Sequence, residues 1–393
     1  MSVRTGYQAE LQRIEQDLAA IGNAGIFLPP IDSQLVTQYV YRLYQRASIS
    51  GGMAALGTAE KAIERALPLL AHKSDLYLLK ANIAFKLHRL ADVEAALAAA
   101  PTVRDSNEGM LLLADLDFQH GRYQEAERGY CQLLKTERSW GALARLAHFR
   151  GKMGDVHNAD RLYCEAGDEL TAKEMRAYSW LEVQRGFLAF AHGNYDEARA
   201  RYERADAAYP GYWLVREYLA ELLGAEDRYR EAIDILEGIS PDGGRPDLHQ
   251  AIGELYERSG QPDRAGYWYE KALAEYLQSA RSGEVHFYHH LADYYADVAK
   301  DGAAAVTWAR ADLRLRENFS TQAVLAWALY RNGRFHEARN WIDRTLASGA
   351  VEAHLFVRAA AIYSAVGNSV PGRRHMESAK RLNPWIENFH IHH

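Results

Sequence analysis

The sequence predicts an all-α protein built from stacked pairs of antiparallel helices, and three observations carry this prediction. Residues 246–279 contain two runs with apolar or small residues at spacings of three and four, which is typical of two amphipathic helices. A short turn-and-helix signature recurs along the chain about every 34 residues. A small residue stands at one fixed place in each repeat, which a wrong alignment of the repeats would not produce.

The stretch 246–279 defines the repeating unit. Ile252 and Tyr256 lie on the apolar face of its first helix, and Tyr269 lies on that of its second. The segment SGQPD between them has turn chemistry, because glycine accepts positive φ and proline can start a helix. One such hairpin cannot bury its own apolar face, so the pattern predicts that copies stack on it.

Copies of the turn-and-helix signature are present at GRYQEA (121–126), GDVHNA (154–159), GNYDEA (193–198), DRYREA (227–232), GQPDRA (260–265) and GRFHEA (333–338). With these motifs the chain resembles the tetratricopeptide-repeat family over about residues 40–386. The resemblance implies a right-handed α-solenoid, the superhelix of that family, and we expect capping helices at the N- and C-terminal ends.

Ten repeats can be aligned, and their eighth position holds only alanine or glycine. These residues are Ala47, Ala81, Ala114, Ala147, Gly186, Ala220, Gly253, Ala292, Ala326 and Ala360. The twenty-fourth position is always large, for example Tyr202 and Tyr269. Large side chains that meet small ones let neighbouring helices approach and interlock.

Two short insertions divide the repeats into blocks. The extra residues are EMRAY (174–178) and ARSGE (280–284), and each is expected to lengthen a helix or a loop. The blocks are repeats one to four (40–173), repeats five to seven (174–279) and repeats eight to ten (280–386). A change of superhelical pitch is expected at the joints, because the period sets the rotation per repeat.

The two ends of the chain do not fit the repeat. Residues 1–39 predict an apolar-striped helix that ends near Gly22, followed by an extended, proline-containing segment. This segment either caps the first repeat or folds into the concave groove. At the other end, apolar residues after Pro384 predict a capping helix on the last repeat, and residues 387–393 form the tail.

Composition and motifs restrict the function classes. The net charge of −6 disfavours nucleic acid as a partner. No apolar stretch is long enough for a membrane span and no secretory signal is visible, so a cytoplasmic protein is expected, with a processed periplasmic form left open. The motifs of serine hydrolases, P-loop nucleotide-binding proteins, zinc proteases and dithiol redox proteins are absent from the sequence, which favours a non-enzymatic protein without a cofactor.

The resemblance implies that the first helix of each pair lines a concave groove. Transferred residue by residue, it gives a set of candidate partner-binding positions in repeats five to nine: Phe187, Phe190, Glu217, Glu221, Asp247, Gln250, Glu254, Glu257, Arg258, His289, Asp293, Asp297, Trp327, Tyr330 and Arg331. In the earlier repeats the same rule gives Asn82, Phe85, Asp115, Phe118 and His148.

The candidate groove is acidic in its middle and aromatic on both sides. Carboxylates in a cleft focus a negative potential, and exposed aromatic side chains act as anchors. The pattern predicts a protein-interaction scaffold that binds a basic, partly apolar peptide or helix. The alternatives are a ligand- or metal-sensing repeat protein or an enzyme on the same solenoid, and self-association through the repeats.

One narrower hypothesis concerns the eighth repeat. His286, His289 and Asp293 follow one another at i, i+3 and i+7, which would place all three on one face of a continuous helix. Two imidazoles and a carboxylate suit a divalent metal such as zinc. They equally suit a pH-dependent contact, because a nearby carboxylate favours the charged imidazole, and the third alternative is an ordinary polar surface.

Overall fold

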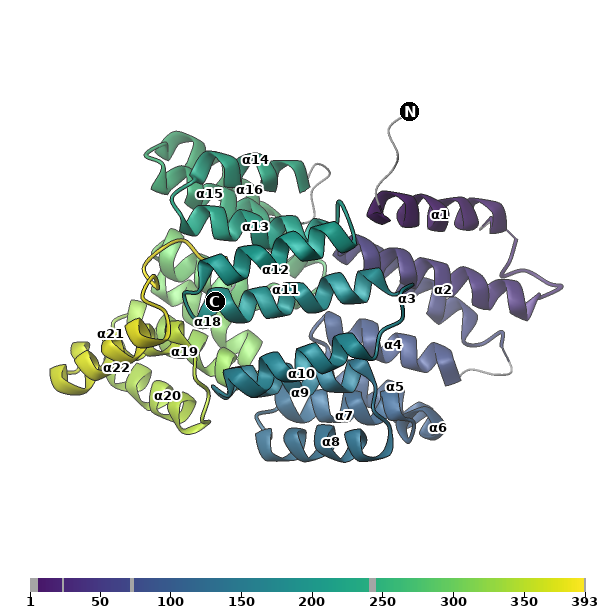
Figure 1. Ribbon diagram of the computed structural model, residues 1–393, viewed down its shortest axis with the longest axis horizontal. Helices are drawn as coiled ribbons and strands as arrows, with labels where there is room; N and C mark the ends of the chain where they lie inside the picture. The colour runs from purple at the N-terminus through teal and green to yellow at the C-terminus, as the bar shows by residue number, and fades with distance from the viewer. Residues whose placement is uncertain (1–5, 23–24, 71–73, 240–244, 392–393) are drawn as a thin grey trace. The chain divides into compact units, whose positions relative to one another are not determined.

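The computed structural model describes residues 6–22, 25–70, 74–239 and 245–391, and within these ranges the chain is all-α. They contain 22 α-helices and one short π-helix, with no strand (Figure 1). Helices that follow one another in sequence pack together, so the prediction of an all-α solenoid of helix pairs is confirmed. None of the helices in these ranges is long and apolar enough to cross a membrane.

The chain divides into two compact units, and each is described by itself. The first unit comprises Met1–Leu112 with Tyr209–Trp213, and the second comprises Leu113–Ala208 with Leu214–His393. The boundary falls inside α7 (Asn107–Gln119), and α13 (Trp213–Ala225) begins at the last residue of the first unit.

The first unit begins with α1, which packs on α2 as an N-terminal cap would. The helices are α1 (Gly6–Ile21), α2 (Ser33–Ser50), α3 (Met53–Ala66), α4 (Ser74–Lys86), α5 (Leu90–Ala99) and α6 (Pro101–Arg104). The segment Tyr209–Trp213 joins this unit through the Trp213 indole, which donates to the Ile49 carbonyl at 2.7 Å. The expected extended segment is instead a series of turns and bends over residues 25–30, because the Leu28 N–H bonds back to the Gly25 carbonyl.

The second unit holds the remaining helices. They are α8 (Tyr123–Thr136), α9 (Trp140–Lys152), α10 (Val156–Asp168), α11 (Met175–Ala191), α12 (Tyr195–Ala208), α14 (Tyr229–Ile239), α15 (Pro246–Arg258), α16 (Pro262–Arg281), α17 (Tyr288–Asp293), the π-helix η1 (Tyr294–Val298), α18 (Gly302–Leu313), α19 (Phe319–Arg331), α20 (Phe335–Ala347), α21 (Ala353–Ala365) and α22 (Ser369–Leu382). Both insertions lengthen helices, since α11 has 17 residues and α16 has 20.

Small residues at the eighth position meet the large residues of the paired helix, as the sequence predicts. A Cβ atom added to Gly186 would lie 2.3 Å from the Tyr202 ring, and one added to Gly253 would lie 2.6 Å from the Tyr269 ring. These rings therefore occupy the space that a side chain at either glycine would need. The close approach of α11 to α12 and of α15 to α16 depends on that fit.

The second unit closes on itself, because its early repeats contact its late ones. The Asn318 side-chain amide donates to Gln119 Oε1 at 2.7 Å, and the Phe319 N–H donates to the Tyr123 hydroxyl at 2.6 Å. One repeat further on, the Val351 N–H donates to the Lys152 carbonyl at 2.9 Å. These bonds join α7, α8 and α9 to the segments that begin α19 and α21.

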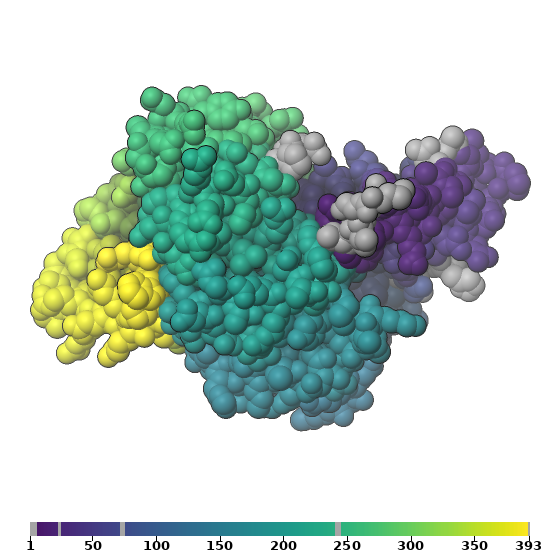
Figure 2. All heavy atoms as spheres, turned by 45° about the horizontal axis from the view of Figure 1, so that its top comes forward, coloured from purple at the N-terminus to yellow at the C-terminus, as the bar shows by residue number. Residues whose placement is uncertain are grey.

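The prediction of a C-terminal capping helix is wrong. After α22 the chain forms turns over residues 384–387 and then an irregular segment up to Ile391. Instead of continuing the stack, this segment runs back to α11 and α13, where its Asn388 amide donates to the Ala225 carbonyl at 2.7 Å (Figure 1). The space-filling view shows the yellow end of the chain directly against teal helices (Figure 2). The chain turns back because the Phe389 side chain, 1% exposed, joins the apolar core of repeats six and seven.

Candidate functional site

The closed second unit contains a cavity of about 430 Å³. Its walls come from the first helices of successive repeats, α9, α11, α13, α15 and α17, which are the helices that the resemblance assigns to the concave face. The start of α21 and the residues after α22 complete the enclosure. The predicted groove is therefore closed over by the end of the same chain.

Several of the residues that line the cavity are aromatic. Phe187 from α11 packs edge to face on Tyr218 from α13, with ring centroids 5.7 Å apart. Phe190, 1% exposed, stacks on Tyr195 and also lies 5.1 Å from the His390 ring. These rings give a bound molecule an apolar wall with π faces.

The cavity lining also contains carboxylates that are paired with arginines of the chain. Arg245 bonds Asp247 at 2.8 Å and Glu217 at 2.9 Å, so one guanidinium serves two carboxylates. Burial raises the pKa of Asp247, but the Arg245 guanidinium outweighs that effect and holds the pKa at about 2. Asp247 is therefore ionised at neutral pH.

Two further lining carboxylates are less well compensated. Glu254 bonds Arg258 at 3.0 Å, and Asp293 bonds Arg358 at 3.2 Å. Burial nevertheless raises the pKa of Glu254 above its ordinary value, and it does the same for Asp293. The direction of the net pKa shift shows that the free-energy cost of burying these charges exceeds the stabilisation that the neighbouring arginines provide.

His148 on α9 is one of the lining residues of the cavity. Burial lowers the pKa of its ring to about 4, with Lys152 lowering it further and Glu352 opposing the shift. The pKa of His390 is also lowered by burial, against the effect of Glu221. Both rings are therefore neutral at pH 7 and leave the negative charge of the cavity in place.

The residues after α22 occupy the groove between α11, α13 and α15. The Ile391 N–H donates to the fully buried Glu221 carboxylate at 2.6 Å, and the Phe389 ring takes the space that a side chain at Gly224 would need. The Arg258 guanidinium lies 5.9 Å from the Phe389 ring centroid and also bonds the Glu387 carbonyl at 3.5 Å. An irregular peptide with an aromatic anchor is thus held there by side chains of the groove.

The structure brings together part of the predicted partner-binding set. The cavity lining includes Phe187, Phe190, Asp247, Gln250, Glu254, His289 and Asp293. Glu217 and Glu221 are buried behind this lining, whereas Glu257 and Arg258 are exposed at the edge of α15.

A second cluster contains the predicted residues of repeats eight and nine that do not line the cavity. The Trp327 indole donates to Asp297 at 2.8 Å and stacks on Tyr330 with centroids 4.9 Å apart. Arg331 donates to the Ala296 carbonyl at 2.9 Å and lies 3.4 Å from Asp297. These four predicted residues are therefore linked by a hydrogen bond, a ring stack and an ion pair. They form a separate surface on η1 and α19.

The three residues of the metal hypothesis do not bring their ligand atoms together. His286 precedes α17 and is buried against the Phe287 ring, because the helix begins only at Tyr288. His289 has the Arg316 guanidinium 3.4 Å from its Nδ1 atom, and Asp293 pairs with Arg358 on α21. The cationic arginine beside His289 disfavours a metal ion at that ring.

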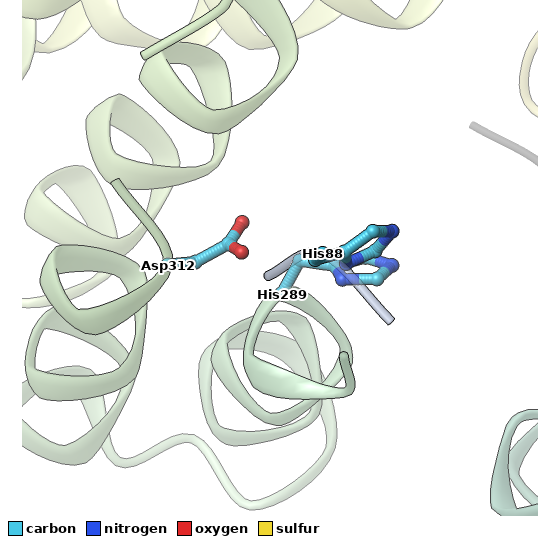
Figure 3. A group of neighbouring side chains, drawn as sticks. All are labelled: His88, His289 and Asp312. Atoms are coloured by element: carbon cyan, nitrogen blue, oxygen red, sulfur yellow. The ribbon is translucent and has the colours of Figure 1, made fainter. Parts of the chain in front are cut away.

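Figure 3 draws His289 on α17 together with Asp312 at the end of α18. Asp312 also bonds Arg316, at 3.0 Å, so this guanidinium lies next to both side chains. The figure includes His88, which belongs to the first unit. Within the second unit, a metal site on His286, His289 and Asp293 therefore lacks support.

Sequence reasoning missed the residues that close the cavity from the end of the chain. Lys152 and Glu352 form an ion pair across the closure, and His354 lies 4.8 Å from His390, centroid to centroid. The signal that could have indicated the closure is the apolar tail itself, since Ile386 and Phe389 are too hydrophobic for a free chain end.

The comparisons with known proteins agree with the repeat pattern. A tetratricopeptide-repeat family model matches residues 189–255. Among solved structures, MamA is 21% identical with a TM-score of 0.34, and the match covers 43% of this chain and 97% of MamA. A chain of the APC/C hetero-tetramer Cut9–Hcn1 is 14% identical with a TM-score of 0.44, over 96% of this chain and 79% of that one. Scores this low support no further argument, and no curated protein matches the sequence.

Proposed function

Since the chain is a tetratricopeptide-repeat protein, a class whose stacked repeats offer an extended concave surface to partners, we propose that it is a non-enzymatic protein-interaction scaffold. Its partner is a peptide with a large apolar anchor, which binds in the groove over α11, α13 and α15. Lysine or arginine residues of that peptide lie beside the carboxylates at the groove edge.

The observation that carries the proposal is the chain's own C-terminal segment in this groove. Its Phe389 ring lies against Gly224 and Leu255, and its backbone donates to the buried carboxylate of Glu221. Contacts of both kinds are available to any peptide with an aromatic residue at that place. The segment therefore acts as a resident occupant that a partner peptide replaces.

The charge of the partner follows from which carboxylates are exposed. Glu217, Asp247 and Glu254 already pair with arginines of the chain. Glu257 is exposed and accepts a hydrogen bond from the Tyr269 hydroxyl at 2.7 Å, whereas Asp297 already lies 3.4 Å from Arg331. A cationic side chain of a partner gains most beside Glu257, because an exposed pair costs little desolvation.

The test uses a synthetic peptide with the sequence of residues 383–391 and the full-length protein. Phe389→Ala removes the resident anchor and leaves its space empty, so this variant should bind the labelled peptide more tightly than the wild type does. Fluorescence anisotropy measures the two dissociation constants. A peptide with alanine in place of its phenylalanine should lose most of the affinity, because the anchor supplies the main buried area.

A second arm tests the charge requirement. A peptide with two added lysines should bind Phe389→Ala more tightly at low salt, and Glu257→Lys in that background should remove the gain. Glu270→Lys on α16 is the matched control, since Glu270 is exposed and does not line the cavity. Equal binding of the phenylalanine and alanine peptides, or no binding to either protein, would refute the groove proposal.

A further inference from the structure

The cavity inside the second unit borders the peptide groove, because Asn383, Ile386, His390 and Ile391 of the C-terminal segment are among its lining residues. The Phe389 ring packs into the core of repeats six and seven and is not part of the lining. The cavity volume of about 430 Å³ lies in the range of small-molecule sites.

Among the residues that line this space, carboxylates outnumber lysines and arginines. Four carboxylates line it: Asp247, Glu254, Asp293 and Glu352. Of the described lining residues, Lys152 alone is a lysine or arginine, and it pairs with Glu352. The arginines that pair with the other three carboxylates are not part of the lining. A molecule inside the cavity can therefore contact these carboxylates directly, whereas their arginine partners do not line the cavity.

Aromatic side chains share the lining of the cavity with the carboxylates. Phe187, Tyr218 and Tyr276 line the same space as Asp247, Glu254 and Asp293. A protonated amine is attracted both by carboxylates and by the faces of aromatic rings, most strongly where water is excluded. A carboxylate or phosphate ligand would be repelled by the same walls.

We propose that the cavity of the second unit binds a small organic cation, a protonated amine on an apolar body. The amine lies on the side of Glu254 and Asp293, and the apolar body lies against Phe187 and Tyr218. This site does not include the position of the Phe389 anchor, and it gives the repeat array a second, small-molecule ligand.

The ionisation of the lining agrees with this ligand class. Burial holds the pKa of Glu254 and of Asp293 above their ordinary values, and the neighbouring arginines do not restore them. A bound cation supplies the missing positive charge and favours both ionised carboxylates. His148 and His390 do not supply this charge at neutral pH, because burial lowers the pKa of His148 to about 4 and that of His390 below its ordinary value.

The first experiment compares three probes of one shape and different charge. They are 2-phenylethylammonium, 2-phenylethanol and phenylacetate, each titrated into the full-length wild-type protein by calorimetry at neutral pH. The ammonium should bind about tenfold more tightly than the alcohol, as charge-assisted hydrogen bonds to carboxylates require. Phenylacetate should give no measurable binding. Equal affinity for all three, a preference for phenylacetate, or no binding of the ammonium would overturn the proposal.

The second experiment locates the site. Glu254→Gln and Asp293→Asn each remove one lining charge, and each should weaken binding of the ammonium about tenfold while binding of the alcohol stays unchanged. Glu270→Gln on the outer face of α16 is the control and should bind the ammonium as the wild type does. If Asp293→Asn fails to fold because Arg358 loses its partner, Glu254→Gln alone decides, since its partner Arg258 reaches solvent. Unchanged ammonium affinity in Glu254→Gln would place the ligand elsewhere and refute the assignment.

Discussion

Gly186→Ala tests directly whether the fit of small against large residues holds the helix pairs together. A Cβ atom at this position would lie 2.3 Å from Tyr202 Cε1, and Tyr202 is 0% exposed, so its ring has no space to move into. Overpacking of this kind costs about 1–3 kcal/mol, whereas alanine in place of a helical glycine returns about 1 kcal/mol. We expect a net loss of up to about 2 kcal/mol in the free energy of unfolding.

Two other glycines provide the comparison, and urea unfolding followed by circular dichroism provides the assay. The unfolding free energy of Gly253→Ala should lie between those of Gly186→Ala and Gly266→Ala, because the neighbouring ring of Tyr269 is partly exposed and can shift. A Cβ atom added to Gly266 on α16 would have no atom within 4 Å. Gly266→Ala should therefore raise the unfolding free energy by about 1 kcal/mol through helix propensity alone. If Gly186→Ala proved as stable as Gly266→Ala, the packing argument for the repeats would be wrong.

Two further changes have expected outcomes. Phe389→Ala should cost about 3–5 kcal/mol in unfolding free energy as a buried aromatic residue, whereas Tyr267→Ala, at a site 62% exposed, should change it by no more than about 0.5 kcal/mol in the same urea assay. A small loss in Phe389→Ala would mean that the tail contributes little to the core. The lowered pKa of His148 means that the folded protein binds fewer protons than the unfolded chain between about pH 6.5 and 4, so stability falls as the pH drops through that window. Thermal melts of His148→Gln should show a shallower fall than those of the wild type, and identical slopes would contradict the assignment.

The helix pairs could be predicted because their determinants are local. The spacing of apolar residues, the turn glycines and the contact between positions eight and twenty-four all lie within one repeat. Gly186 and Tyr202 illustrate this, since 16 positions separate them and the structure places them in contact. Patterns that span so few residues can be recognised in a single sequence.

The closure and the tail could not be predicted in the same way. Gln119 and Asn318 are 199 residues apart, and no periodicity links a residue in the third repeat to one that precedes the ninth. The apolar tail indicated burial, and the family pattern directed that burial to the last repeat. The side chains of Phe389 and Ile391 instead join the core of repeats six and seven.

The acidic character of the groove was predicted, but its neutralisation was not. The resemblance placed Asp247, Glu254 and Asp293 on the concave side, and all three line the cavity. Arg258, the partner of Glu254, lies four residues further along the same helix and was among the predicted residues, whereas the partners of the other two come from places that positional rules do not address. Arg245 precedes α15, and Arg358 is 65 residues from Asp293. For this reason the sequence suggested open carboxylates where the structure has ion pairs.

The closure of the second unit also limits how this gene could change in length. In an open array each repeat contacts only its neighbours, so a duplicated or deleted repeat at an end is tolerated. Here the bonds from Gln119 to Asn318 and from Lys152 to Val351 require a fixed number of repeats between α8 and α19. One extra repeat would carry Asn318 away from its partner and leave buried amide groups unsatisfied. Homologues that preserve the closure should therefore vary in loops and at the N-terminal end, while the count of repeats between these two contacts stays constant.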